Sequence, residues 1–484
     1  MARIKIFTLL FLAALLFQAC STAQVPDSYS SVGESPAIYP DYRDVTIPCN
    51  LAPVNFMLAD SDVKQAVARI TASDGSIYTY GKGKRIVIDE SDWVKMLSAS
   101  KGNSLTIEVF GKTEAGWLAY CPFKIFVASD EIDPYVSYRL IEPSYVAFEE
   151  LSINQRRLTD FEESEIYNNQ LISKANNGQC INCHSFQNYH TDNMLFHMRA
   201  YQGGTMMVID GKTKKVDLKR NGMISAGVYP AWHPSLPLVS FSTNSTHQIF
   251  FAKGEDKVEV YDTKSDLVLY DVKKDEIIPV SNNEGEMETF PTWSPDGKWL
   301  YFCSTLYTEE QGKDIVHTFE EIKYNVYRMP FDADNNSFGP RELVYQADSL
   351  NKSATLPRIS PDGRFMTFAQ GPYGCFQIWH HEADIQVLDL STGELLDTQA
   401  INSTRAESYP SWSSNSRWLM FASRRDDGNY SRIYIAYFDQ DGEFHKAFEL
   451  PQKNPEKYIQ QLKSYNRPEF MVEPVKNNPQ EFAK

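Results

Sequence analysis

Phe290-Pro291-Thr292-Trp293-Ser294-Pro295-Asp296-Gly297 is the stretch that decides the fold, and it leads into the alternating run Trp299-Leu300-Tyr301-Phe302. Pro-Asp-Gly is a turn sequence, because proline fixes φ and glycine accepts a left-handed backbone. Alternating apolar residues are typical of a half-buried strand. The stretch therefore predicts a turn that feeds a β-strand.

The same unit recurs through the carboxy-terminal two-thirds of the chain, which indicates a repeat architecture. A second strand-like run follows in each unit. The related stretches are Tyr229-Pro230-Ala231-Trp232-His233-Pro234 before 238–241, Leu356-Pro357-Arg358-Ile359-Ser360-Pro361-Asp362-Gly363 before 365–368, and Tyr409-Pro410-Ser411-Trp412-Ser413 before 418–421. The second runs lie at 266–271, 325–329, 384–389 and 432–436.

These motifs resemble the WD40-like (PD40) repeats of TolB-type β-propellers over about residues 180–450. The resemblance implies an all-β propeller and says little about function. Five blades are visible in the sequence, and residues 135–172 are the candidate for a sixth. Residues 41–130 contain alternating strands separated by turns, which favours a small β-sandwich. We therefore expect a sandwich at 41–130, a propeller at 131–450 and a polar tail at 451–484.

Cys180-Ile181-Asn182-Cys183-His184 reads C-x-x-C-H, the pattern of c-type haem attachment. Two thiols separated by two residues can form thioethers to one porphyrin, and the histidine that follows can ligate the iron. The sequence predicts covalent haem c at Cys180 and Cys183, with His184 as the proximal iron ligand. A redox dithiol, a disulfide and half of a zinc site are the alternatives. A zinc site needs a second pair of ligands, and His190 and His197 are only a loose set.

The sixth iron ligand is open, and four nearby side chains are candidates. They are Met194, His197, Met198 and His190. A methionine would favour a higher potential than a second histidine. The repeat spacing aligns Cys183 with Trp232, so we expect the motif to occupy the Trp-Ser-Pro-Asp turn of an earlier blade.

The amino-terminal residues predict export. Arg3 and Lys5 precede a short apolar run at 6–17, too short to span a bilayer. The run ends at Ala19-Cys20, which resembles a bacterial lipobox. We expect a signal peptide at 1–19, lipidation of Cys20 and a flexible linker over 20–40. An ordinary signal peptide with an incidental cysteine is the alternative.

The net charge, the cysteines and the motifs that the sequence lacks restrict the class of function. The 484-residue chain carries a net charge of −16, which argues against nucleic acid as a partner. Cys49 and Cys121 lie in one region and could form a disulfide. The chain lacks the G-x-S-x-G and H-E-x-x-H patterns of common hydrolases.

The sequence therefore predicts a lipid-anchored c-type haem protein of the bacterial cell envelope, periplasmic or on the outer membrane. The expected role is electron transfer with an unidentified envelope or redox partner. Two alternatives stay open. One is a propeller scaffold that binds a protein or glycan and carries a structural haem, and the other is a haem peroxidase or oxidase.

Overall fold

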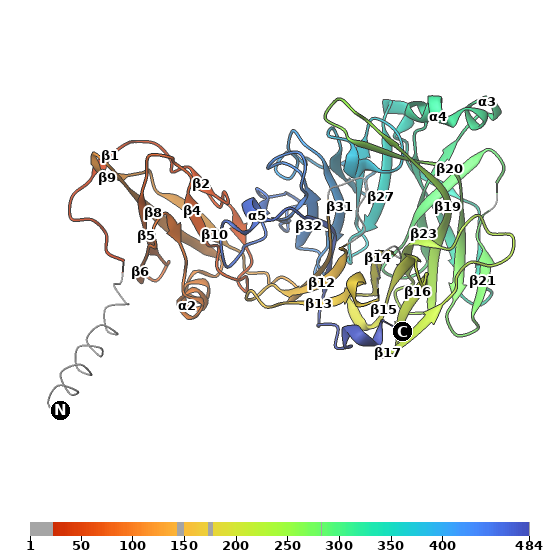
Figure 1. Cartoon of the computed structure of the whole chain (residues 1–484), viewed down its shortest axis with the longest axis horizontal. Coiled ribbons are helices and arrows are strands. Elements are labelled where there is room, and N and C mark those ends of the chain that lie inside the picture. Colours follow the sequence, from red (N-terminus) through yellow and green to blue (C-terminus); the bar gives the residue numbers. More distant parts are fainter. Residues whose placement is uncertain (1–22, 143–149, 173–177, 282, 484) are drawn as a thin grey trace. The chain divides into compact units, whose positions relative to one another are not determined.

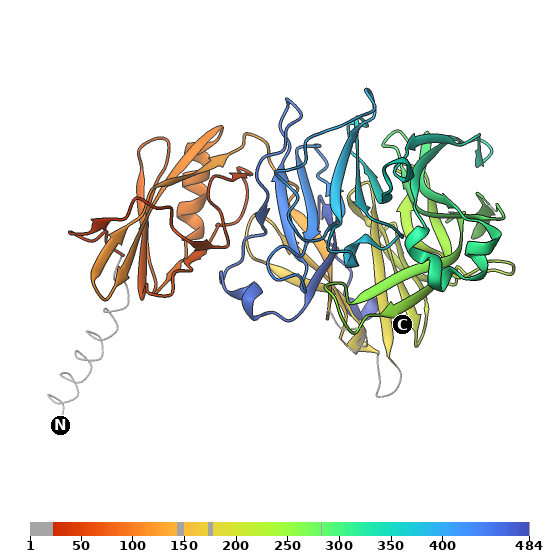
Figure 2. The ribbon, with the colours of Figure 1, turned by 90° about the horizontal axis from the view of Figure 1, so that it is seen from above.

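The computed structural model describes residues 23–142, 150–172, 178–281 and 283–483. The chain divides into two compact units, whose described parts are 23–129 with 451–457, and 130–450 with 458–483 (Figures 1 and 2). Within those described ranges, no helix has the length and apolar character that crossing a bilayer requires.

The amino-terminal unit contains two sheets and a helix in its described residues. Helix α2, Glu90–Ser100, begins at Asp89, whose side chain accepts hydrogen bonds from two backbone N–H groups of the first turn. The helix was not expected from the sequence. One sheet holds β1 (Ser30–Ser31), β3 (Thr46–Ile47), β5 (Gln65–Thr71), β6 (Ile77–Tyr80), β8 (Asn103–Thr113), β9 (Gly116–Ala119) and β10 (Phe123–Val127). The other holds β2 (Ile38–Tyr39), β4 (Phe56–Leu58) and β7 (Arg85–Ile86).

The described residues of the larger unit form a β-propeller of six blades, each an antiparallel meander (Figure 1). Five blades follow the chain order from the inner strand outward. The first two of these blades are β14 (Gln179–Gln187), β15 (His190–Ala200), β16 (Gly204–Ile209) and β17 (Lys212–Val216), then β18 (Val228–Trp232), β19 (Leu238–Phe250), β20 (Val258–Asp271) and β21 (Glu276–Pro279). The next contains β22 (Glu286–Trp293), β23 (Trp299–Leu306), β24 (Asn325–Asp332) and β26 (Glu342–Tyr345), with β25 (Ser337–Phe338) beside β24. The last two are β27 (Ser353–Ile359), β28 (Phe365–Gly371), β29 (Asp384–Asp389) and β30 (Glu394–Leu395), then β31 (Glu407–Trp412), β32 (Trp418–Ser423), β33 (Arg432–Tyr437) and β34 (Phe448–Glu449). The short helices are α3 (Glu309–Lys313), α4 (Ile315–Thr318), α5 (Lys457–Gln460), η1 (Asn169–Leu171), η2 (Phe319–Glu321), η3 (Asp348–Leu350), η4 (Gln377–Trp379) and η5 (Pro479–Glu481).

The sixth blade closes the ring by joining both ends of the unit. Its outer strands are β11 (Tyr135–Ile141), β12 (Ser152–Arg157) and β13 (Glu163–Asn168), and its inner strand is β35 (Ser464–Met471). The expectation of a polar tail at 451–484 is therefore wrong for β35. That strand reads as polar because it contains Arg467 and Glu469, yet all of its residues are buried. The two charges are buried together because they pair with each other, at 3.1 Å.

The six inner strands lie side by side around a central channel in the order β14, β18, β22, β27, β31, β35. Each inner strand contains a β-bulge at which one residue adopts a left-handed backbone, with φ between 51° and 55°. In five strands the next residue is proline. In β14 the pair is Cys183-His184. The left-handed residues are Cys183, Tyr229, Phe290, Leu356, Tyr409 and Arg467.

This register corrects the expected position of the haem motif. Cys183 corresponds to Tyr229, and Phe186 corresponds to Trp232. The motif therefore lies three residues before the predicted turn, inside the inner strand. Spacing alone misplaced it because β14 continues into a tight two-residue turn at Asn188-Tyr189, where β22 and β27 have a longer Ser-Pro-Asp-Gly turn.

The Ser-Pro-Asp-Gly turn forms as predicted. The Ser294 hydroxyl donates to Asp296 at 2.6 Å and accepts the backbone N–H of Trp299 at 3.0 Å. Gly297 has φ +71°, and a Cβ there would lie 2.4 Å from the ring of His233. Both the backbone and the close approach therefore require glycine.

Candidate functional site

The haem motif lies on β14, the inner strand of its blade. Cys180 faces Arg199 across the strand pair, and Asn182 faces His197. Both cysteines are free thiols and are half-buried. Burial raises the pKa of Cys180 above its usual value. Arg139 of β11 donates to the carbonyl of Ile181 at 3.1 Å, which ties the middle of the motif to the neighbouring blade.

His184 is fully buried, and neither ring nitrogen has a hydrogen-bond partner among the described residues. Burial lowers the pKa of His184 to about 3, while Glu469 acts to raise it and Arg467 to lower it. Buried polar groups in proteins are almost always hydrogen-bonded, so a histidine with two free nitrogens needs an explanation. An imidazole that is neutral and unpartnered is in the state that ligates a metal.

The donor set fits haem chemistry, because two free thiols precede an imidazole with an available nitrogen. The space inside the channel limits how a porphyrin could bind. The waist of the channel, lined by the bulges of the other five inner strands, encloses about 30 Å³. That is room for about two water molecules. His184 is completely buried and does not line this space, so a porphyrin on Cys180 and Cys183 that is ligated by His184 would require β14 to pack differently from the haem-free chain.

The structure separates the four candidate sixth ligands. Met194 and Met198 are buried in the apolar cluster that Cys180 also contacts. His197 is buried on the other side of β15, where Nδ1 lies 2.8 Å from the Thr205 hydroxyl and Nε2 has no partner among the described residues. Burial lowers the pKa of His197 to about 3. His190 is exposed and lies 3.4 Å from Glu473.

The remaining cysteines lie away from the motif. Cys303 is fully buried in a core cluster, and burial raises the pKa of its thiol. Cys49 and Cys121 do not form a disulfide with each other. Cys20 lies outside the described residues. Across the described part of the chain, no three His, Cys, Asp or Glu side chains group closely enough to hold a metal ion.

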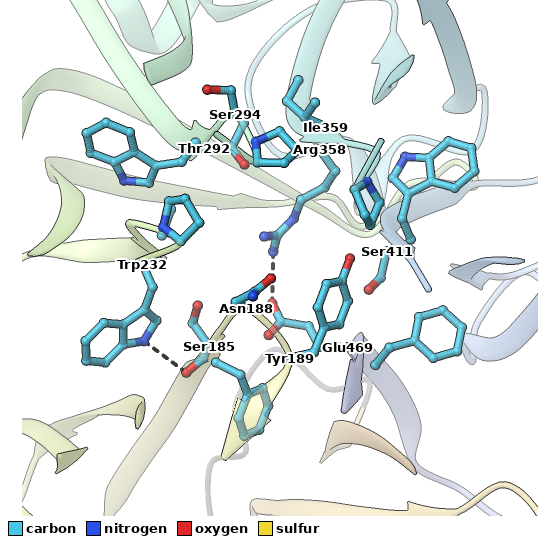
Figure 3. Close-up of a pocket in the computed structure, with 18 residues that line it drawn as sticks. Ser185, Asn188, Tyr189, Trp232, Thr292, Ser294, Arg358, Ile359, Ser411 and Glu469 are labelled. Carbon is cyan, nitrogen blue, oxygen red and sulfur yellow. Dashed lines mark hydrogen bonds and ion pairs between the residues drawn. The ribbon is translucent and has the colours of Figure 1, made fainter. Parts of the chain in front are cut away.

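A larger cavity of about 310 Å³ lies at the channel mouth next to the motif (Figure 3). Ser185 and the tip of the β14–β15 turn, Asn188 and Tyr189, line one side of it. Arg358 of β27 reaches across the mouth to Glu469 of β35 at 2.9 Å, and Figure 3 shows this ion pair as the centre of the cavity. The residues of the lining come from all six blades.

Burial acts to raise the pKa of Glu469, but the charges of Arg467 and Arg358 outweigh burial. The net effect is a lowered pKa, so the carboxylate is ionised. The sequence analysis missed this network. Arg358 and Glu469 occupy the same position in their strands, two residues after the left-handed residue, where the other strands carry Ser185, Ala231, Thr292 and Ser411. An alignment of the repeats shows Arg358 as a charged residue where other repeats have a small one. The segment that contains Glu469 lacks the repeat turn, so its sequence alone does not align it with the other inner strands.

No known protein family model matches this chain, and no curated protein matches it. Solved structures are similar to it at low identity. A nidogen–laminin complex matches at 8% identity over 70% of this chain and 99% of that chain, with a TM-score of 0.40. Prolyl oligopeptidase B from Galerina marginata matches at 10% identity over 85% of this chain and 54% of its own, with a TM-score of 0.35. A periplasmic gluconolactonase from Pseudomonas aeruginosa matches at 10% identity over 65% and 82%, with a TM-score of 0.28. At these scores the propeller is established by this chain's own blades, and no activity is carried over.

Proposed function

We propose that this protein is a lipid-anchored β-propeller of the bacterial cell envelope that carries one covalent c-type haem and exchanges electrons with an envelope partner. Cys180 and Cys183 would hold the porphyrin, and His184 would ligate the iron. The observation that carries the proposal is His184, a fully buried imidazole with two unpartnered nitrogens, directly after two free thiols.

When bound, haem supplies a one-electron redox centre. The chain's own contribution is to keep the imidazole neutral. Burial is the main cause that lowers the pKa of His184; Arg467, Arg139 and Arg358 act in the same direction, and Glu469 opposes them. This environment disfavours protonation of the imidazole and keeps Nε2 or Nδ1 free as a ligand. The apolar residues around Met194 and Met198 exclude water from one side of β14.

The test is the mass of the intact protein after expression with a c-type haem maturation system. We expect the wild-type mass to rise by one haem and the haem to survive denaturing electrophoresis. The double variant Cys180→Ala, Cys183→Ala should lose it. Cys121→Ala, which removes a half-buried thiol from the other unit, is the matched control and should keep it. An unchanged wild-type mass in cells that mature a control cytochrome overturns the proposal.

The spin state of the haem distinguishes an electron-transfer protein from a haem enzyme. A low-spin, six-coordinate spectrum supports electron transfer, and a high-spin spectrum supports a haem peroxidase or oxidase. Met194→Ala, His197→Ala and Met198→Ala should identify the sixth ligand, since only the variant that lacks it turns a low-spin haem high-spin. His190→Ala tests the exposed alternative.

Lipid anchoring rests on the lipobox-like Ala19-Cys20 alone. We expect the wild-type protein in the membrane fraction and Cys20→Ala in the soluble fraction, because a multiply acylated cysteine anchors stably. Wild-type protein that is already soluble contradicts the anchor and leaves the haem proposal intact.

The mouth cavity favours a second candidate function, a propeller scaffold that binds a glycan or a protein segment. Its volume of about 310 Å³ is within the range of small-ligand sites, and Arg358 and Glu469 place both signs of charge inside it. Binding to a glycan array that is lost in Arg358→Ala, while the haem content is unchanged, would support this role.

A further inference from the structure

Away from the channel mouth of Figure 3, a second cavity of about 230 Å³ lies between the tip of the β19–β20 hairpin and the ends of two other blades. The hairpin supplies residues 254–257, η4 supplies Trp379, and the segment after β32 supplies Arg424. The long β19–β20 hairpin reaches over the neighbouring strands in Figure 1. The cavity therefore combines elements that are distant in the sequence.

A buried contact fixes this arrangement. His380 follows η4 directly, and its Nε2 lies 2.7 Å from a carboxylate oxygen of Glu259 on β20, both side chains being almost completely buried. The other ring nitrogen of His380 lies 3.0 Å from the side-chain oxygen of Gln377. The contact of His380 with Glu259 therefore links the β19–β20 hairpin to η4, the element that carries Trp379.

Arg424 is the unusual residue of the cavity. Its side chain lines the cavity, the residue is 9% exposed, and its Nε has no hydrogen-bond partner among the described residues. The guanidinium lies over the Trp379 ring, 4.3 Å from the centroid. Burial lowers the pKa of Arg424 to about 10, and Asp256 and Asp427 act through charge alone to raise it. A buried guanidinium with an unused donor is costly unless a ligand accepts from it.

The neighbouring charges are already paired. Arg405 donates to Glu255 at 2.5 Å, Nδ1 of His381 lies 3.1 Å from Asp256, and Lys257 donates to the carbonyl of Gly254 at 2.6 Å. The cavity wall carries three basic residues, Arg424, Arg405 and Lys257, against three acids, Glu255, Asp256 and Asp427. The lining therefore carries no net charge before a ligand binds. Arg424 can offset the charge of a monoanion, whereas the second charge of a dianion would lie near Glu255, Asp256 and Asp427 while Arg405 and Lys257 are already hydrogen-bonded.

We propose that this cavity is a binding site for a small organic carboxylate, held by Arg424. A guanidinium presents two parallel donors that match the two oxygens of a carboxylate. Trp379 keeps the guanidinium in one plane, which leaves its edge for the ligand. The volume of about 230 Å³ leaves room for a body attached to the carboxylate. The proposal is independent of the haem.

Isothermal titration calorimetry on the full haem-free chain tests the site, with acetate and glucuronate as probes. Glucose is the matched ligand without the carboxylate, and inorganic phosphate, in buffer well above its second pKa, is the matched dianion. We expect binding of at least one carboxylate, at least tenfold tighter than glucose or phosphate. Arg424→Gln should weaken that binding at least tenfold, and Arg424→Lys should weaken it as well because the second donor of the fork is lost.

Arg328→Gln is the control variant, because it removes a positive charge from the outer edge of the β22 blade, outside the cavity lining. It should change the affinity less than threefold. Thermal unfolding without ligand shows that the variants fold, and Arg424→Gln should unfold at the wild-type temperature or above it. Three results overturn the proposal: no carboxylate binding at 50 mM, tighter binding of phosphate, or wild-type affinity in Arg424→Gln.

Discussion

Strands β14 and β22 occupy equivalent places in the propeller, and the residue that follows the bulge differs between them. Both line the channel and bulge at a left-handed residue, but β22 continues with Pro291 and β14 with His184. Proline suits a bulge, because it has no N–H to leave unpaired where the ladder is interrupted. His184 instead buries two ring nitrogens without partners. The fold explains the proline and does not require the histidine, so the histidine points to chemistry.

The largest expected effect concerns the apolar ring next to the bulges. Trp412 is 2% exposed and packs against Phe365 and Phe438. Trp412→Ala should lower the free energy of unfolding by about 4 kcal/mol, because it leaves a large cavity. Phe186, its counterpart on β14, is 9% exposed and contacts the His184 ring. Phe186→Ala should cost about 2 kcal/mol less than Trp412→Ala in denaturant titrations. Equal losses would mean that Phe186 is packed as tightly as Trp412, despite its greater exposure.

The next effect concerns the ion network of the channel. Glu469 accepts from Arg358 and Arg467, and removal of a buried partner leaves the others uncompensated. Glu469→Gln should cost about 3 kcal/mol by the same titration. Glu342→Gln breaks an exposed pair with Arg328 on the outer edge of the β22 blade and should cost less than about 1 kcal/mol. A similar small loss in both variants would mean that Glu469 is not needed to hold the channel together.

The sequence predicted the propeller because its turn and strand signals are local. Ser294, Asp296 and Gly297 make their hydrogen bonds within a few residues, so the turn of a repeat can be predicted from its local sequence. The closing strand β35 carries none of that turn chemistry. Its burial depends on a partner strand over 300 residues earlier, β11, and on charges that neutralise each other only in the folded ring. Long-range pairing of this kind leaves no periodic pattern to read.

The residues of the candidate site also fall into two groups, those that local sequence predicts and those that only the fold brings together. Cys180, Cys183 and His184 form a contiguous motif and were identified from the sequence, although their place in the strand was not. Arg358, Glu469 and Arg424 are single residues on separate strands or segments. Each acquires its environment only through the ring of blades, so single-sequence reasoning could not bring them together.

A smaller effect should appear with pH in the haem-free protein. Burial lowers the pKa of His197 to about 3 in the folded chain, against about 6.5 when unfolded. The unfolded state therefore binds a proton more readily, and stability falls as the pH drops from about 6.5 towards 3. At pH 4.5 the loss from His197 alone should reach about 2.7 kcal/mol, because one pKa unit corresponds to about 1.36 kcal/mol. His197→Gln should show a shallower decline in urea titrations between pH 7 and 4.5. His190→Gln changes an exposed histidine and should follow the wild-type curve.

The smallest effect tests the comparison of β14 with β22 most directly. His184→Pro gives β14 the bulge sequence of the other five strands, and the left-handed residues before their prolines show that this backbone accepts proline. The haem-free variant should be as stable as the wild type or up to about 1 kcal/mol more stable, because proline restricts the unfolded chain and the unpartnered imidazole is gone. The reverse change, Pro291→His, should cost about 2 kcal/mol. In the haem maturation system His184→Pro should lose haem attachment while its fold is retained. If His184→Pro instead destabilises the haem-free chain as much as Pro291→His, the imidazole supports the fold, and the argument that assigns it to a ligand fails.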